Sequence, residues 1–417
     1  MQAIEQGTIP IEIQPVTDAV GIKTMVLTEE QDFDRLQVEW DQLLDESKDG
    51  GYFLRYTWNH LWWRTYSPPN SHLLLIACRD EYGQLIGLAP FYWRQSSLGL
   101  REIYFLGTGI EIKTSEYLNL LAKQGYEQVV AQAIVRTLQR RNDWDRLFLW
   151  GVPETQVFQH FQAALGKKAI VEICDRTHHV ATDVDWETFR QSLGSATRKK
   201  VDYHYRRLFK AHNCEFRRIE TLEELQPAID ALIRLHQLRW ESKGEPGSFR
   251  LPRFESFLRE IAKKNLAEGR LRLWTLTIDG QIATAQIAFF DRGIAHVFQG
   301  GFDPAYADYR IGNVIFWLCI KDCIESDDVQ EFDFMGGGAA YKKLWTKEGR
   351  ELVELEFFNS PLRSVIYEKG IKAILNFRLA ARKIVPKLII KFVRQRLNRR
   401  AHRKAGPVHG ESGSLLK

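Results

Sequence analysis

The stretch Tyr309–Trp345, YRIGNVIFWLCIKDCIESDDVQEFDFMGGGAAYKKLW, decides the fold of this 417-residue chain. Gly312 closes a loop, and a long apolar run then extends from Val314 to Ile324. A run of this length exceeds a typical strand, so it predicts a buried helix. The first amides of a helix and its dipole attract anions, and a glycine there lets a phosphate approach the backbone. The segment therefore predicts an anion-binding helix N-terminus.

A strand is predicted directly after this helix, over Val329–Met335. Its side chains alternate, so that two phenylalanines share one face while Asp333 points to the other. Residues 336–338 are glycines, and Tyr341 and Lys342 follow shortly after them. Helix, strand, glycines and a Tyr-Lys pair together indicate a reactive strand end beside the anion-binding helix.

The remaining chain also alternates helices and strands. Asp279 and Gly280 separate two strand-like runs and are the strongest hairpin signal in the sequence. Thr221 with Glu224 three residues later matches a capping box and predicts a helix start. Further strands are predicted at Leu73–Cys78, Leu85–Trp93, Glu102–Leu106, Tyr117–Leu121 and Trp144–Gly151.

An internal repeat relates the two halves of the chain. GQLIGLAPFYW at residues 83–93 matches GQIATAQIAFF at residues 280–290 in sequence and in place. Two copies of one mixed α/β unit are therefore implied, and 417 residues exceed a single ordinary core. We predict a degenerate N-terminal copy at residues 22–184, a catalytic C-terminal copy at residues 185–360 and a tail at residues 361–417.

Composition limits the class of protein. Hydrophobic residues make up 44% of the chain and charged residues 27%, which indicates a globular protein. Five widely spread cysteines, an odd number, fit a reducing compartment better than a disulfide framework. The sequence shows neither a secretory signal pattern nor a run of eighteen apolar residues. We therefore expect a cytoplasmic protein.

The tail differs in charge from the body. Residues 361–417 hold 15 Lys and Arg against two Glu, a local charge of +13, so with a net charge of +5 the body carries −8. Between residues 371 and 400, apolar and basic residues recur at helical spacing, and Pro386 is expected to kink the helix. This pattern is typical of a basic amphipathic helix on an anionic bilayer surface, and equally of a helix packed on the body.

Five segments carry a wider resemblance. They are LHQLRW (235–240), RLRLWTLTIDGQIATAQIAFF (270–290), GFDP (301–304), YRIGNV (309–314) and FDFMGGGAAYKKLW (332–345). Together they resemble the GNAT acyltransferase superfamily, and within it the CelD-like branch of cellulose-biosynthesis clusters, which is related to Fem-type peptidyltransferases. The resemblance covers residues 185–350 well and residues 30–180 more faintly. It implies a mixed sheet splayed open in the middle, acyl-CoA in the cleft, and direct attack of an acceptor amine on the thioester.

The resemblance implies acetyl-CoA or another acyl-CoA as co-substrate. The usual pyrophosphate loop reads Q/R-x-x-G-x-G/A, but here Tyr309 holds its first place and Val314 its last. Fewer glycine amides can therefore approach a pyrophosphate. We assign Arg310, Gly312 and Asn313 to cofactor binding, with a plain helix-start glycine as the alternative for position 312. Fem-type relatives use aminoacyl-tRNA, so that donor stays open.

The same resemblance places the catalytic candidates. Amine attack on a thioester needs a neutral amine, an oxyanion donor and a proton source for the leaving thiolate. We predict that Asp333 orients or deprotonates the acceptor amine, Tyr341 protonates the sulfur, and Lys342 holds a phosphate or the developing negative charge. The alternatives are a buried pairing partner for Asp333 and a solvated surface lysine for Lys342. Because His296 lies on an apolar strand, we interpret it as a core histidine, with a catalytic role as the alternative.

Three other groups have a structural and a functional interpretation. His236 and Arg239 form either a structural or an acceptor-side pair. The basic helix at residues 198–210 is either a solvated face or attracts phosphates of a nucleotide-linked sugar, coenzyme A or tRNA. Cys319 and Cys323 lie in an apolar helix without nearby histidines, so we expect no metal site.

These observations favour an acyl-CoA-dependent N-acyltransferase of the N-acetyltransferase type. Its acceptor would be the amine of an amino sugar or of another polar precursor for the cell envelope or a polysaccharide, free or nucleotide-linked. One alternative is a Fem-type aminoacyl-tRNA-dependent transferase, and only there is a nucleic acid expected as a partner. Another is a non-catalytic, membrane-associated component of a polysaccharide biosynthesis cluster. The tail predicts peripheral contact with the inner face of an anionic membrane.

Overall fold

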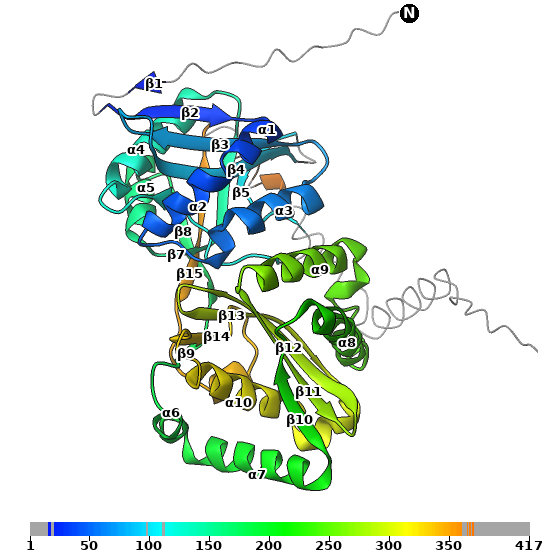
Figure 1. The fold of residues 1–417 in the computed structure, drawn as a ribbon. Helices are drawn as coiled ribbons and strands as arrows, with labels where there is room; N and C mark the ends of the chain where they lie inside the picture. The colour runs from blue at the N-terminus through cyan, green and yellow to red at the C-terminus, as the bar shows by residue number, and fades with distance from the viewer. Residues whose placement is uncertain are drawn as a thin grey trace, which may run out of the picture.

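The computed structural model describes residues 16–17, 21–96, 99–110, 113–360, 365, 367 and 369–370. Two β-sheets form its two ends, and helices surround each sheet (Figure 1). Within the described part of the chain, no helix is long and apolar enough to cross a membrane. The segment predicted as an amphipathic helix, at residues 371–400, lies outside the described residues, as does Pro386.

The first sheet is built mainly from the N-terminal half. Its strands are β1 (Val16–Thr17), β2 (Lys23–Leu27), β3 (Ser71–Arg79), β4 (Leu85–Gln95), β5 (Arg101–Phe105), β6 (Leu121–Ala122), β7 (Arg146–Pro153), β8 (Ile170–Arg176) and β15 (Glu351–Phe358). They follow the order β1-β2-β3-β4-β5-β7-β15-β8, and β6 pairs with β4. Residues 85–92 of β4 are all buried, which explains their continuous apolar sequence.

The second sheet contains the hairpin that the sequence predicts. Its strands are β9 (His179–Ala181), β10 (Cys214–Arg218), β11 (Leu271–Ile278), β12 (Gln281–Asp291), β13 (Ile294–Phe302) and β14 (Glu331–Asp333), in the order β10-β11-β12-β13-β14-β9. Asp279 and Gly280 join β11 to β12 with φ values of +49° and +83°. A two-residue turn with both φ values positive matches the right-handed twist of its strands, so the hairpin prediction is confirmed.

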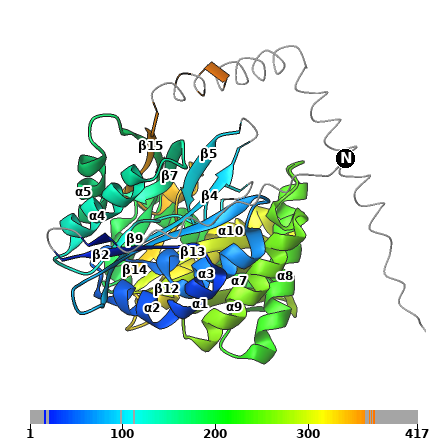
Figure 2. The ribbon, with the colours of Figure 1, turned by 90° about the horizontal axis from the view of Figure 1, so that it is seen from above.

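The helices cover both sheets. They are α1 (Glu30–Arg35), α2 (Gln37–Glu46), α3 (Tyr56–Tyr66), α4 (Glu127–Arg140), α5 (Gln156–Leu165), α6 (Trp186–Ser192), α7 (Ser195–Ala211), α8 (Leu222–Glu241), α9 (Pro252–Ala267) and α10 (Ile311–Ile324), with 3₁₀ turns η1 (Tyr52–Leu54), η2 (Ser248–Arg250), η3 (Pro304–Tyr309) and η4 (Lys342–Leu344). Thr221 caps α8 as predicted, because its Oγ1 accepts a hydrogen bond from the Glu224 amide at 3.3 Å. Helices α4 and α5 lie side by side (Figures 1 and 2).

The same succession of elements occurs twice. The hairpin β3–β4, strand β5, helix α4 and strand β7, parallel to β5, make up the first copy. The hairpin β11–β12, strand β13, helix α10 and strand β14, parallel to β13, make up the second. This is the mixed α/β fold predicted from the sequence, with its unit present twice.

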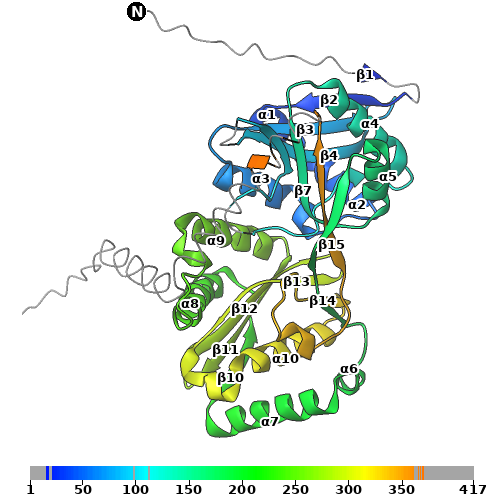
Figure 3. The same cartoon turned by 180° about the vertical axis from the view of Figure 1, so that it is seen from behind.

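Each sheet is completed by a strand from the other half. Strand β15 belongs to the residues predicted as the catalytic copy, yet it inserts between β7 and β8, antiparallel to both (Figure 3). Strand β9 precedes the predicted boundary at residue 184, yet it pairs with β14 of the second sheet. Backbone hydrogen bonds therefore join the two halves in both directions.

An apolar core also continues between the sheets. Tyr52 of η1 stacks on Phe289 of β12, with ring centroids 4.9 Å and planes 1° apart. Trp58 of α3 packs edge-on against Phe257 of α9, at 4.9 Å. Such pairs stabilise by about 0.5–1.5 kcal/mol beyond the burial of their area. The N-terminal copy is thus held against the C-terminal one and can place side chains near its site.

Candidate functional site

The second sheet opens between β13 and β14. These parallel strands pair only from Ile294–Glu331 to His296–Asp333. Beyond this point β13 continues along β12, and a register shift opposite Ile287 and Ala288 bends it. The chain after Asp333 turns away, with Met335 in the left-handed region at φ +59°. The strands therefore part immediately after the His296–Asp333 pair, as the GNAT resemblance implies.

A cavity of about 430 Å³ lies between the end of β13 and the start of α10. Its apolar wall includes Phe302, Ile311, Ile315, Phe316 and Leu344. Its charged lining consists of Lys200 from α7, Arg239 from α8 and Arg310 before α10. No Asp or Glu occurs among the described residues that line it. A cavity with cations, no acids and an apolar wall suits an anionic ligand with an apolar part.

The three residues assigned to cofactor binding meet in this cavity. Arg310 is the N-cap of α10, with a left-handed φ of +51°, and no side chain caps the helix. Gly312 and Asn313 line the cavity beside it. A Cβ built on Gly312 would lie 3.4 Å from the Phe302 ring, which is also part of the lining. The first turn of α10 is thus open to an anion.

The three predicted catalytic residues are divided between two places. Tyr341 lines the cavity and stacks on Phe316, with ring centroids 5.3 Å and planes 11° apart. Burial raises the pKa of Tyr341, and the nearby Arg239 opposes this rise. Asp333 and Lys342 are absent from the described lining of the cavity and belong to a buried polar network beside it.

Asp333 is the centre of this network and is fully buried. Its Oδ2 accepts a hydrogen bond from the Tyr117 hydroxyl at 2.5 Å, and His296 Nδ1 lies 3.4 Å from the same oxygen. Its Oδ1 accepts a hydrogen bond from the Met335 amide at 2.7 Å. Burial would raise the pKa of Asp333, but His296, Tyr117 and the amide together leave it below its ordinary value. The carboxylate is therefore held ionised where β13 and β14 part.

Comparison with known proteins agrees with this geometry. Residues 195–343 match the family model described as an acetyltransferase (GNAT) domain. This segment is therefore similar to GNAT domains. It contains all six residues assigned to catalysis and cofactor binding, and its fold is of the acyltransferase type.

Three solved structures are similar in fold to about four fifths of the chain, including both copies of the unit. A crystal structure of FemX has 12% sequence identity and a TM-score of 0.58, covering 79% of this chain and 98% of that one. The C-terminal domain of a putative lysylphosphatidylglycerol synthetase from Agrobacterium fabrum has 8% identity and a TM-score of 0.50, covering 82% and 97%. A conserved protein of unknown function from Bacteroides thetaiotaomicron has 12% identity and a TM-score of 0.53, covering 80% and 100%. No curated protein matches the chain by sequence.

Tyr117 belongs to the N-terminal copy but contacts Asp333 of the segment that matches the GNAT model. The predicted strand Tyr117–Leu121 is wrong, because β6 contains only Leu121 and Ala122, and Tyr117 has a left-handed φ of +56°. Left-handed backbone is unfavourable for a bulky residue and is often found at functional sites. Sequence reasoning missed Tyr117 because its partner Asp333 is 216 residues away.

The ammonium group of Lys342 is hydrogen-bonded to backbone carbonyls within the same segment. Its side chain is buried, and its Nζ donates hydrogen bonds to the carbonyls of Met335, at 2.9 Å, and Gly336. Burial lowers the pKa of Lys342, while Glu116 and Asp333 oppose this change. Lys342 is thus not a solvated surface lysine. It ties the chain after β14 to the segment that carries Tyr341.

The glycine run is held by the N-terminal copy as well. Glu116 Oε2 accepts a hydrogen bond from the Gly336 amide at 2.6 Å, and Asp175 Oδ1 accepts one from Gly337 at 3.0 Å. Lys113 Nζ bridges the two acids, at 2.7 Å from Glu116 and 2.5 Å from Asp175. Among the residues that the structure describes, no group of three or more His, Cys, Asp or Glu could hold a metal ion.

Close packing of α8 on β13 brings Arg239 to the cavity. A Cβ on Gly301 would lie 2.2 Å from the backbone nitrogen of His236, so only glycine allows this approach. His236 is buried, and burial lowers its pKa to about 4. Arg239 follows on the same helix, with its guanidinium carbon 5.0 Å from the centre of the Phe302 ring.

The buried His236 predicts an acid-sensitive fold. Above the pKa of about 6.5 in the unfolded chain, the imidazole is neutral in both states and its stability contribution is complete. As the pH falls towards the folded pKa of about 4, only the unfolded chain gains the proton, so stability is lost. We expect His236 to account for a loss of about 2 kcal/mol between pH 7.5 and pH 5.

Urea unfolding of the wild type and of His236→Gln at both pH values measures this contribution. The variant should start less stable at pH 7.5 but lose about 2 kcal/mol less on acidification, because its amide does not titrate in this range. Parallel loss of stability in the two proteins would contradict the assignment.

Proposed function

We propose that this protein is an acyl-CoA-dependent N-acyltransferase that transfers an acetyl or other acyl group to an amine. The acceptor would be an amino sugar or another polar precursor of the cell envelope or a polysaccharide. The observation that carries the proposal is the cavity between the end of β13 and the N-terminus of α10, which has three cations and no Asp or Glu among the described residues that line it. Coenzyme A joins a phosphate-rich nucleotide end to a flexible, uncharged arm that ends in the thiol, and this combination matches the lining.

The donor phosphates would lie against Arg310, Gly312 and Asn313, with Lys200 nearby. Helix amides and the dipole of α10 bind the anion, and the two side-chain cations offset its charge. The thioester would then extend towards the point where the strands part, which lies at Asp333.

The side chains around Asp333 would then carry out the acyl transfer. Asp333 would orient or deprotonate the acceptor amine, directly or through the Tyr117 hydroxyl bonded to it. The amine nitrogen would attack the carbonyl carbon, the carbon–sulfur bond would break, and Tyr341 would give its proton to the departing thiolate. Lys342 would hold the carbonyls of Met335 and Gly336 and thereby position the segment that carries Tyr341.

The direct test is product formation. The purified protein is mixed with acetyl-CoA and a panel of amino sugars and other polar amines, and products are identified by mass spectrometry. We expect one acceptor to gain the mass of an acetyl group while free coenzyme A is released. If neither product forms and coenzyme A does not bind, the proposal fails.

A second candidate is a Fem-type aminoacyl transferase of the same GNAT superfamily. The observation that favours it is the likeness of the whole two-copy fold, over 79% of this chain, to FemX. In this case the donor would be aminoacyl-tRNA. Activity that requires charged tRNA and disappears on RNase treatment would select this candidate over acyl-CoA.

The basic tail gives a separate prediction about location. We propose that residues 361–417 attach the protein to the inner face of an anionic membrane, because each basic residue near such a surface contributes about 1 kcal/mol. A chain truncated after Ser360 should lose co-flotation with vesicles of anionic lipid, whereas the full chain should float with them. Equal flotation of both would contradict the proposal, and neutral vesicles serve as the control.

A further inference from the structure

Arg239 enters the cavity as a cation without an acidic partner. Its Nε is buried and makes no hydrogen bond. Within the described part of the chain, no carboxylate forms an ion pair with its guanidinium, which lies over the face of the Phe302 ring. A poorly hydrated, unpaired cation is costly, so a stable fold is expected to neutralise it.

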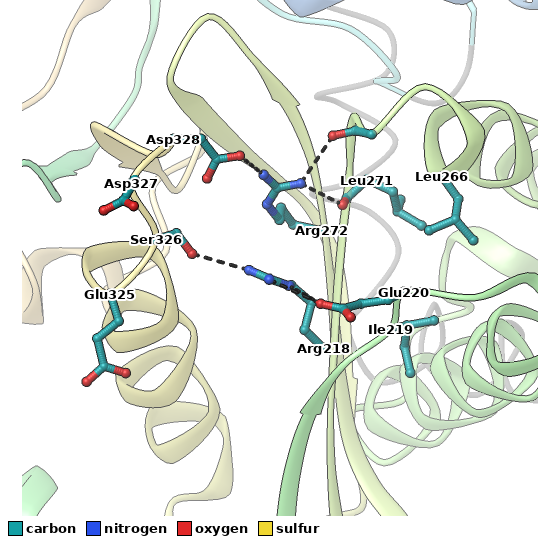
Figure 4. Close-up of a pocket in the computed structure, with 11 residues that line it drawn as sticks. Arg218, Ile219, Glu220, Leu266, Leu271, Arg272, Glu325, Ser326, Asp327 and Asp328 are labelled. Carbon is teal, nitrogen blue, oxygen red and sulfur yellow. Dashed lines mark hydrogen bonds and ion pairs between the residues drawn. The ribbon is translucent and has the colours of Figure 1, made fainter.

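The arginines that are buried in the described part of the chain, Arg55, Arg146 and Arg272, are neutralised by acids. Arg55 pairs with Asp291 at 2.9 Å, and Arg146 pairs with Glu102 at 3.1 Å. The same holds in a second cavity of about 450 Å³, shown in Figure 4. There Arg218 pairs with Glu220 at 3.1 Å and donates to Ser326 at 3.2 Å, and Arg272 pairs with Asp328.

The cations that line the cavity come from three elements: Lys200 from α7, Arg239 from α8 and Arg310 from the start of α10. Lys200 and Arg310 both lower the pKa of His204 in α7, whereas Arg239 opposes the rise in the pKa of Tyr341, the proposed acid. If Lys200 and Arg310 take the phosphates of the donor, Arg239 is left beside the group that would protonate the thiolate.

We infer that Arg239 binds a carboxylate or phosphate of the acceptor, so that the substrate is an anionic amine. This inference rests on the proposed function and narrows its substrate class. The guanidinium fork matches carboxylate and phosphate oxygens in a bidentate way, and the Phe302 ring holds its plane. An amino acid or a phosphorylated amino sugar has this chemistry, whereas a neutral amino sugar leaves Arg239 unpaired.

Two pairs of small-molecule probes distinguish a phosphate from a carboxylate as the group that Arg239 binds. Glucosamine 6-phosphate is compared with glucosamine for a phosphate, and alanine with alaninamide for a carboxylate. Binding of each probe, and of coenzyme A, is measured by calorimetry in the wild type, Arg239→Gln and Arg239→Lys. Arg234→Gln is the matched control, an exposed arginine of the same helix that donates to the Ile282 carbonyl at 3.1 Å.

We expect the wild type and Arg234→Gln to bind the anionic member of one pair about 10- to 100-fold more tightly than its neutral partner. Arg239→Gln should lose this preference, Arg239→Lys should restore part of it, and coenzyme A should bind all four proteins equally. Melting curves show whether each variant is folded.

Other outcomes overturn the inference. A preference that survives in Arg239→Gln, or no preference for an anion in the wild type, removes Arg239 as the recognition residue. A loss of coenzyme A affinity in Arg239→Gln places Arg239 in the donor site instead. If coenzyme A does not bind the wild type but the Arg239-dependent preference persists, the proposed donor is wrong while anion recognition stands.

Discussion

Asp333→Asn should lower turnover by about 10²–10⁴-fold on the identified substrate, the usual cost of removing a positioned acid or base. The amide can still accept the hydrogen bond from the Met335 amide, but it cannot take a proton from the amine or carry the negative charge next to His296. The loss should appear in kcat and much less in the Kd of coenzyme A. Steady-state kinetics combined with calorimetry measures both.

Companion variants make this result interpretable. Tyr117→Phe removes the hydroxyl that donates to Asp333 and should reduce kcat less than Asp333→Asn does, because water can replace it. Asp327→Asn changes an exposed carboxylate and should leave activity unchanged. If Asp333→Asn and Lys342→Ala both turned over at the wild-type rate, the active site would lie elsewhere, and His296 would be the next residue to replace.

Gly312→Val should weaken the binding of coenzyme A at least about 100-fold. A Cβ at this position points towards the Phe302 ring at 3.4 Å, and the branched side chain would fill the cavity where phosphate oxygens must approach the amides of α10. The fold should persist, because this Cβ meets a side chain of the cavity and no backbone atom. Calorimetry gives the affinity, and a melting curve reports the fold.

Two variants calibrate this effect. Gly312→Ala adds only the Cβ and should reduce the affinity less than valine does. Gly51→Val adds the same side chain at a glycine whose Cβ would meet no atom within 4 Å, so coenzyme A binding should not change. Unchanged affinity in Gly312→Val would remove the N-terminus of α10 from the donor site.

Local patterns in the sequence determined the fold class and the residues at the start of α10, where we propose that the donor binds. The repeat at residues 83–93 and 280–290 predicted two copies of one unit, and strands β4 and β12 occupy equivalent places. The apolar run after Gly312 predicted α10, and neighbours in sequence, Arg310, Gly312 and Asn313, necessarily lie together at its start. Such features depend on periodicity and turn chemistry within a few residues, which a sequence displays directly.

Only the tertiary structure decided which distant residues meet. Nothing near Tyr117 indicates that it would adopt left-handed backbone and bind a carboxylate 216 residues away. Lys342 faces backbone carbonyls instead of the cavity, because the chain after β14 turns back on itself. The sequence left Arg239 with a structural or an acceptor-side interpretation, and only the structure showed that no acid among the described residues pairs with it. These contacts arise because each half of the chain contributes a strand to the sheet of the other half, which packs the two sheets together. No local pattern in the sequence encodes that packing.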